Sequence, residues 1–156
     1  TAGIATLLAV ALFSVVSIVM PTTDDWQNAL GVITSGLVLG LVTAAMLLGH
    51  WYLNAPGMRL QPLRRLILLA VVALAVHAVV CGLGANRAAF NVPWTMLTLR
   101  WSFGFGGVLV LLAMAWQTLK IPNTQSATGI LYVAVIAAFA GELSGLLVSA
   151  SVGFAL

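Results

Sequence analysis

The chain has 156 residues, of which 62% are hydrophobic and 6% are charged, whereas soluble domains carry about 25% charged residues. This composition excludes an ordinary water-soluble domain and is typical of a polytopic helical membrane protein. The net charge of +3 comes from dispersed basic residues beside the apolar stretches, as in topology signals, so no nucleic-acid role is expected.

Five long apolar stretches occupy most of the chain and are separated by short polar or proline-containing connections. A hydrocarbon core about 30 Å thick requires roughly 20 apolar helical residues to cross it, and the first stretch comes close to this length while the others reach it. No connection is long enough to fold into a soluble module. We therefore predict a single all-α transmembrane domain with about five spans, at residues 3–20, 29–53, 66–84, 95–119 and 129–151.

The first stretch has neither a basic flank nor a small-residue cleavage pattern, so it is expected to be a retained helix rather than a signal peptide. The positive-inside rule places the loops richest in lysine and arginine in the cytoplasm. With the amino terminus inside, the inner segments hold Arg59, Arg64, Arg65 and Lys120, and the outer ones hold Arg87 and Arg100. We predict an N-in, C-out protein of a bacterial inner membrane, with Asp24 and Asp25 on the outer side.

The second stretch ends in an aromatic segment that contains His50 and Trp51. This segment is expected at the membrane interface, where His50 beside Trp51 could hydrogen-bond a quinone carbonyl or ligate a chlorin or haem. Alternatively, both residues are interfacial anchors, because amphipathic rings are favoured at this depth. The sequence leaves both interpretations open.

Three ionisable residues lie inside later stretches: His77 in the third, Arg100 in the fourth and Glu142 in the fifth. Such groups are costly within a membrane and are functional candidates. His77 and Glu142 lie about 18 and 20 Å from the inner ends of their helices, so they are expected at similar depth. Arg100 could extend toward the outer headgroups or toward Glu142. The three residues could form a proton-handling or quinone-contacting cluster, or a structural Arg100–Glu142 or His77–Glu142 pair that fixes helix register.

A haem held by both histidines is not expected. The antiparallel second and third helices place His50 and His77 about 12 Å apart in depth, whereas two axial ligands face each other at one level. Ligation of a pigment by one histidine stays open. The single cysteine, Cys81, provides neither an internal disulfide nor a metal-finger motif, and the spans contain no recognised catalytic motif.

Small residues at four-residue spacing predict close helix packing on two stretches. They are Gly36, Gly40 and Ala44 in the second stretch, and Ala137, Gly141, Gly145, Ser149 and Gly153 in the fifth. The Phe-Gly-Phe-Gly-Gly segment at residues 103–107 lacks the lysine of a phosphate loop. It is expected to mark a close helix crossing rather than a ligand site.

The segment Gly-Glu-Leu-Ser-Gly-Leu-Leu at residues 141–147, followed by Ala-Ser-Val-Gly at 150–153, is similar to the last helix of membrane-anchor subunits of the DMSO reductase and polysulfide reductase type. In that family an arginine and aromatic residues follow the second glycine, where this chain has Leu146 and Leu147. The resemblance implies a non-catalytic anchor or accessory subunit of an electron-transfer complex. Glu142 is the polar residue of this chain to which the resemblance gives a possible role.

The first functional hypothesis is an integral, non-catalytic membrane subunit of a respiratory or photosynthetic electron-transfer complex. Its expected partners are other membrane subunits and lipids, and its candidate cofactors are quinone, carotenoid or chlorin. The candidate binding residues are His50, Trp51, His77, Arg100 and Glu142. The alternative is a small transporter or proton-conducting protein that uses His77, Arg100 and Glu142. A membrane-embedded enzyme ranks last, because few polar residues converge at one interface.

Overall fold

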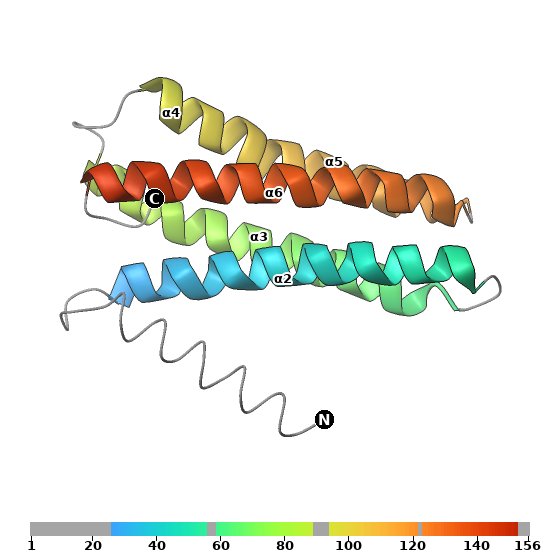
Figure 1. Cartoon of the computed structure of the whole chain (residues 1–156). Coiled ribbons are helices and arrows are strands. Elements are labelled where there is room, and N and C mark those ends of the chain that lie inside the picture. Colours follow the sequence, from blue (N-terminus) through green and yellow to red (C-terminus); the bar gives the residue numbers. More distant parts are fainter. Residues whose placement is uncertain (1–25, 56–58, 89–93, 122, 153–156) are drawn as a thin grey trace.

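The computed structural model describes residues 26–55, 59–88, 94–121 and 123–152 (Figure 1). The predicted first span, residues 3–20, lies outside the described residues, as do Asp24 and Asp25. Each of the other four predicted spans is helical. The all-helical class is thus confirmed for the described part of the chain.

The described chain consists of three unbroken helices and a fourth made of three consecutive segments. The unbroken helices are α2 (Trp26–Asn54), α3 (Gln61–Ala88) and α6 (Thr124–Val152). The segments of the fourth are α4 (Trp94–Leu99), η1 (Arg100–Gly107) and α5 (Val108–Thr118). Four stretches of these helices are long and apolar enough to cross a membrane: Ala29–Asn54, Gln61–Leu83, Arg100–Thr118 and Thr124–Leu147.

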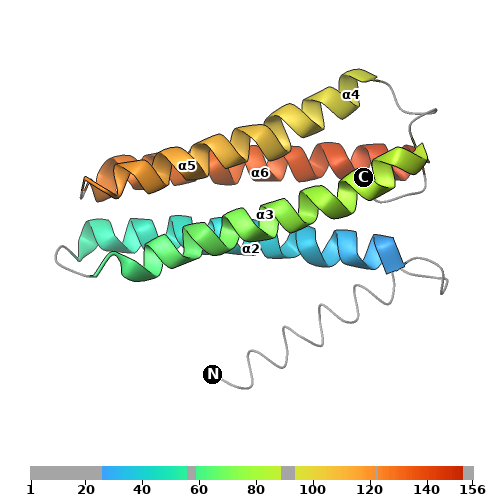
Figure 2. The same cartoon turned by 180° about the vertical axis from the view of Figure 1, so that it is seen from behind.

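The four helices form a bundle in which α2 packs on α3 and α6, while α6 also packs on η1 and α5 (Figures 1 and 2). Because α2 and α3 are joined by a short connection at residues 55–60, they run antiparallel as neighbours. Helix α6 therefore contacts both halves of the bundle, and residues on it can meet side chains from every other helix.

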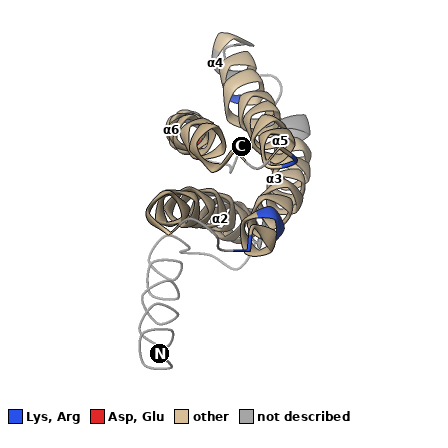
Figure 3. Ribbon diagram, turned by 90° about the vertical axis from the view of Figure 1, so that its right-hand side faces the viewer, with Lys and Arg blue, Asp and Glu red and all other residues tan. Residues whose placement is uncertain are grey.

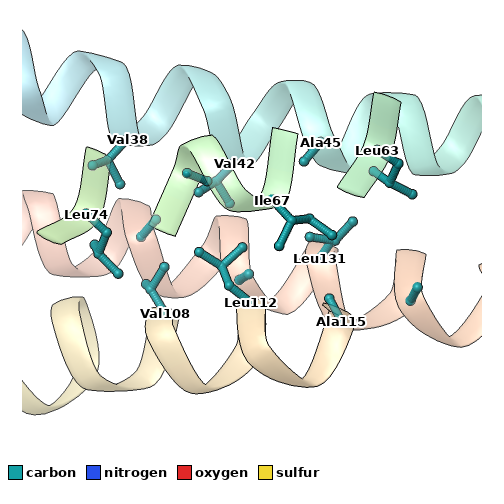
Figure 4. Close-up of a cluster of buried hydrophobic side chains, with 14 of the residues drawn as sticks. Val38, Val42, Ala45, Leu63, Ile67, Leu74, Val108, Leu112, Ala115 and Leu131 are labelled. Carbon is teal, nitrogen blue, oxygen red and sulfur yellow. The ribbon is translucent and has the colours of Figure 1, made fainter. Parts of the chain in front are cut away.

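Apolar side chains from all four helices fill the centre of the bundle (Figure 4). The buried residues recur at spacings of three and four, which places them on one face of each helix. They include Val38, Val42 and Ala45 in α2, Ile67, Ala70 and Leu74 in α3, Val108, Leu112 and Ala115 in α5, and Leu131, Ala134 and Ala138 in α6. In α3 this buried row continues into His77 and Cys81. The core of the bundle thus becomes polar towards one end.

The fourth helix is widened at η1, where a π-helix carries backbone hydrogen bonds five residues apart in place of four. Arg100 and Phe105 are both buried in this segment. In an α-helix, residues five apart would point about 140° away from each other. The π-helix therefore allows both side chains to face the bundle. Sequence periodicity alone did not predict this segment.

Helix α3 begins five residues earlier than the predicted third span, because Pro62 is accommodated in its first turn and the arginines that follow are compatible with a helix. The start of α3 meets the end of α5, since Arg64 Nη2 donates a hydrogen bond of 2.5 Å to the carbonyl of Leu119. Basic residues gather at this end of the bundle (Figure 3). They are Arg59, Arg64, Arg65 and Lys120.

Candidate functional site

His77 is the centre of a buried polar site within the apolar bundle. Only 1% of its surface is exposed. Its Nε2 lies 2.9 Å from Oε1 of Glu142 on α6, and its Nδ1 lies 2.8 Å from Oγ1 of Thr34 on α2. Both ring nitrogens therefore have hydrogen-bond partners, and the imidazole joins three helices.

The hydroxyl of Thr34 determines which groups donate a proton in the hydrogen bonds that link Thr34, His77 and Glu142. Its Oγ1 lies 2.6 Å from the carbonyl of Leu30, one turn earlier in α2. Two oxygens at that distance require a hydrogen between them, so the single Thr34 hydroxyl proton is donated to Leu30. Thr34 Oγ1 then accepts from the Nδ1–H of His77. The proton between Nε2 and Glu142 is therefore a second proton, shared by the two side chains.

Glu142 is held from the opposite side by Ser35, whose hydroxyl donates a hydrogen bond of 2.6 Å to Oε2. Each carboxyl oxygen thus has one partner, and only 16% of the Glu142 side chain is exposed. The shared proton can lie on the imidazole, giving an imidazolium and a carboxylate, or on Glu142, giving two neutral groups. The pair is uncharged overall in both forms, so the proton can move between them without changing the net charge.

Arg100 enters the same region from η1 and is 3% exposed. Of the two directions that the sequence left open, Arg100 takes the one toward Glu142, since its guanidinium lies against Gly145, three residues from Glu142 on α6. Within the described residues it forms no hydrogen bond to Glu142; its Nη2 donates to Sγ of Cys81 at 3.2 Å. Cys81 Sγ is in turn 3.7 Å from Nε2 of His77. Cys81 thus lies between the two basic side chains.

Phe105 closes the site on the η1 side. Its ring centroid is 5.4 Å from that of His77, and the Arg100 guanidinium carbon lies 5.6 Å from the same centroid. The aromatic face offers Arg100 a cation–π contact and covers the polar groups on this side. We call Thr34, Ser35, His77, Cys81, Arg100 and Glu142 the polar cluster.

Two glycines of α6 allow η1 to approach closely enough to complete the polar cluster. A side chain at Gly141 would overlap the backbone of Gly104, and a side chain at Gly145 would overlap the guanidinium of Arg100. The close crossing predicted for the Phe-Gly-Phe-Gly-Gly segment is thus present. By contrast, no described atom lies within 4 Å of the Cβ position of Gly36 or Gly40, so the predicted packing on α2 has no partner in this part of the chain.

The polar cluster lies near one end of the apolar spans. Along the described helices, Thr34 follows the start of α2 at Trp26 by eight residues and Glu142 precedes the end of α6 at Val152 by ten, which corresponds to about 12 and 15 Å. The same residues are more than about 25 Å from the opposite ends of the spans. The cluster is thus closer to one end of the described helices than to the other.

The structure brings together His77, Arg100 and Glu142 but places His50 and Trp51 elsewhere. His50 is exposed, with its Nδ1 3.3 Å from the hydroxyl of Tyr132, and Trp51 is 65% exposed. Because His77 contacts Thr34, it lies about 24 Å along α2 from His50. The predicted depth difference of 12 Å is wrong, since α3 begins at Gln61 and His77 is correspondingly farther along it.

Sequence reasoning missed Thr34, Ser35 and Cys81. Cys81 follows His77 by four residues and so shares its helix face, a signal that was available. Thr34 and Ser35 resembled ordinary small polar residues of a span, because hydroxyls bonded to their own helix are common there. Only the packing of α2 against α3 and α6 distinguishes them.

Within the described residues, no group of three or more histidine, cysteine or acidic side chains is placed to hold a metal ion. No family model matches the sequence, and comparison with curated proteins and with solved structures finds no similar protein. The geometry of the polar cluster is therefore the basis for the functional argument.

Proposed function

We propose that this chain is an integral membrane protein that binds and releases a proton at the His77–Glu142 pair. The observation that carries this proposal is the 2.9 Å bond between Nε2 and Oε1 inside an apolar bundle, with a hydroxyl on each outer side of the pair. An ionisable pair at such a place is costly to maintain. Two apolar residues would pack the same helices without this cost. A proton-handling role explains why an ionisable pair is present instead.

Arg100 supports the release step. When the pair loses its shared proton, it is left with one negative charge among apolar helices, which is unfavourable without a nearby cation. Arg100 supplies that cation because its guanidinium lies over Gly145, three residues from Glu142 and on the same face of α6. Both the loaded and the unloaded pair can therefore exist within the bundle.

The competing interpretation is a purely structural pair that fixes the register of α3 against α6. The two interpretations differ in what Glu142→Gln does, because glutamine keeps a hydrogen bond but holds no titratable proton. If the pair is only structural, the Glu142→Gln variant keeps its activity. If the pair is a proton site, the variant loses it.

The test is proton flux in sealed proteoliposomes that contain a pH-sensitive dye, driven by an imposed pH gradient with equal potassium chloride and valinomycin on both sides to hold the membrane potential at zero. Glu142→Gln and His77→Gln are expected to reduce the flux at least tenfold, with the variant bundles still folded. His50→Gln is the matched control, since His50 lies on the exposed surface about 24 Å from Thr34, and it is expected to leave the flux unchanged. Equal flux in wild type, Glu142→Gln and empty liposomes would reject the proposal.

We further propose an N-in, C-out orientation in a bacterial inner membrane. It is supported by Arg59, Arg64, Arg65 and Lys120, which gather at one end of the described helices, as the positive-inside rule expects of a cytoplasmic end. In a Cys81→Ser background, Lys120→Cys should react with a membrane-impermeant thiol reagent only after the cells are opened. Labelling in intact cells would show that the orientation is the opposite one.

An accessory subunit of an electron-transfer complex is the second candidate. Gly36 and Gly40 favour it, because α2 offers a small-residue surface on which no described atom lies within 4 Å, and such surfaces pack against other helices. Purification from native membranes in mild detergent tests this role. Redox subunits or a quinone or pigment in fixed ratio would support it, and a colourless chain without partners would reject it.

A further inference from the structure

Arg100 has a permanent charge that the described residues scarcely balance. Its one hydrogen bond is to Cys81 Sγ, and sulfur is a weak acceptor. Its Nε–H is buried and has no acceptor in the described chain. A buried donor on a charged group that lacks an acceptor is unfavourable and calls for an explanation, such as an ion that belongs at the site.

The charges around Arg100 can be summed helix by helix. Helix α2 contributes only the hydroxyls of Thr34 and Ser35, and α3 contributes His77 and Cys81. Glu142 is the carboxylate that α6 supplies. A His77–Glu142 pair that holds its proton is neutral in either of its forms. The proton-loaded cluster, with a neutral thiol at Cys81, therefore carries one net positive charge, located on Arg100.

We propose that the polar cluster binds one small monovalent inorganic anion, such as chloride, at Arg100 when the His77–Glu142 pair holds its proton. This inference rests on the proposed function. In the loaded state the anion balances Arg100. In the unloaded state the Glu142 carboxylate balances Arg100 and the anion leaves. The proton and the anion therefore bind together and leave together, and no covalent bond changes.

The surroundings of the guanidinium favour a small, singly charged ligand. The guanidinium lies directly against the backbone of Gly145 on one side and faces the ring of Phe105 on the other, so little space is left beside it. The buried donor without an acceptor in the described chain is the Nε–H of Arg100, and the sulfur of Cys81 lies beside the guanidinium. A divalent anion would leave an uncompensated negative charge in the bundle. A chloride or nitrate ion matches both the charge and the available donors.

The first experiment measures thermal unfolding of the purified full chain in an uncharged detergent. Sodium gluconate is compared with sodium chloride and sodium nitrate at equal ionic strength, because gluconate is too large to enter. At a chloride concentration about tenfold above its Kd, chloride is expected to raise Tm by about 3 °C. Arg100→Gln should abolish the difference between the salts, whereas Arg65→Gln, which removes the same charge from an exposed site, should retain it.

The second experiment measures proton uptake when chloride is added to weakly buffered wild-type protein containing a pH indicator. Because the two ligands are linked, binding of each anion should draw up to about one proton from solution at starting pH values at which the His77–Glu142 pair has released its proton, and gluconate should draw none. This measurement requires no variant, so it decides the question even if Arg100→Gln fails to fold. An equal Tm in all three salts together with no chloride-driven uptake overturns the inference, and so does a chloride effect that persists in Arg100→Gln.

Failure of this inference is distinguishable from failure of the proposed function. If Glu142→Gln abolishes proton flux but chloride changes neither Tm nor proton uptake, the cluster handles protons without an anion. If chloride raises Tm through Arg100 but no proton accompanies it, the anion site is real and the linkage to the pair is wrong. If proteoliposomes show no flux above empty liposomes, the proposed function fails independently of either result.

Discussion

Arg100 of η1 lies directly against Gly145 of α6, in the space that a side chain at that glycine would fill. The missing Cβ thus creates room for a charged group inside the bundle. Gly145→Ala is expected to displace the guanidinium and to destabilise the protein by about 1–3 kcal/mol, as overpacking does. Thermal unfolding should show a Tm lower by about 2–4 °C for each kcal/mol.

Gly36→Ala is the matched control for this change. Gly36 is also a mid-helix glycine, but no described atom lies within 4 Å of its Cβ position. Alanine there is expected to keep or raise Tm, because it has a higher helix propensity than glycine by about 1 kcal/mol. Opposite signs for the two substitutions support the fit of Arg100 against Gly145, and equal signs contradict it.

The crossing of Gly104 and Gly141 leads to a second prediction. A Cβ on Gly141 would overlap the Cα of Gly104, and a Cβ on Gly104 would lie 3.0 Å from the Cα of Gly141. In both cases the atom in the way belongs to the backbone and has little freedom to move. Gly141→Ala should therefore separate η1 from α6. It is expected to lower the free energy of unfolding by about 1–3 kcal/mol and, with it, Tm by several degrees.

Gly40→Ala provides the comparison for Gly141→Ala, since Gly40 also has open space around its Cβ position. The Gly141 variant is expected to lose proton flux as well, because separation of the helices removes Arg100 from the cluster. A Gly141→Ala protein with wild-type Tm would show that the two backbones are not in contact.

The approximate positions of the described helices follow from the sequence because hydropathy and length determine where lipid-crossing helices form. The four predicted spans that fall in the described chain are all helical. His77 and Glu142 could be placed at a similar depth in advance because residue spacing gives the depth of a side chain along a helix. Depth alone did not decide between a His77–Glu142 and an Arg100–Glu142 pair, because that choice depends on packing.

The rest of the site depends on rotation about the helix axes, which spacing does not determine. Arg100 faces Cys81 only because η1 is a π-helix, and the apolar pattern of that stretch does not distinguish a π-helix from an α-helix. Thr34 joins the site through its contact with another helix. Partners that are set by packing between helices were thus out of reach of the sequence.

Thr34 provides a third prediction because its Oγ1 accepts the Nδ1–H of His77. Thr34→Val keeps the size and branching of the side chain but leaves Nδ1–H unpaired in the bundle, which is expected to cost about 1–3 kcal/mol. Thr34→Ser restores an acceptor and should recover most of the loss in Tm.

Thr118→Val serves as the control, since the Thr118 hydroxyl donates to the carbonyl of Met114 on its own helix and contacts no other helix through that bond. Its Tm should stay within about 2 °C of wild type. If Thr34→Val has as small an effect as Thr118→Val, the bond from His77 to Thr34 contributes nothing measurable.

The last prediction concerns Arg64, which connects the start of α3 to the end of α5. Its Nη2 donates to the carbonyl of Leu119 at the end of α5, and the positive charge also complements the helix dipole. Because Arg64 is only half-buried, its removal in Arg64→Gln is expected to cost about 1 kcal/mol. Arg65→Gln removes the same charge from an exposed neighbour and should change Tm by less than half as much. Urea or thermal unfolding of both variants measures the difference, and equal losses would show that the net charge at this end of the bundle, rather than the bond to Leu119, is responsible.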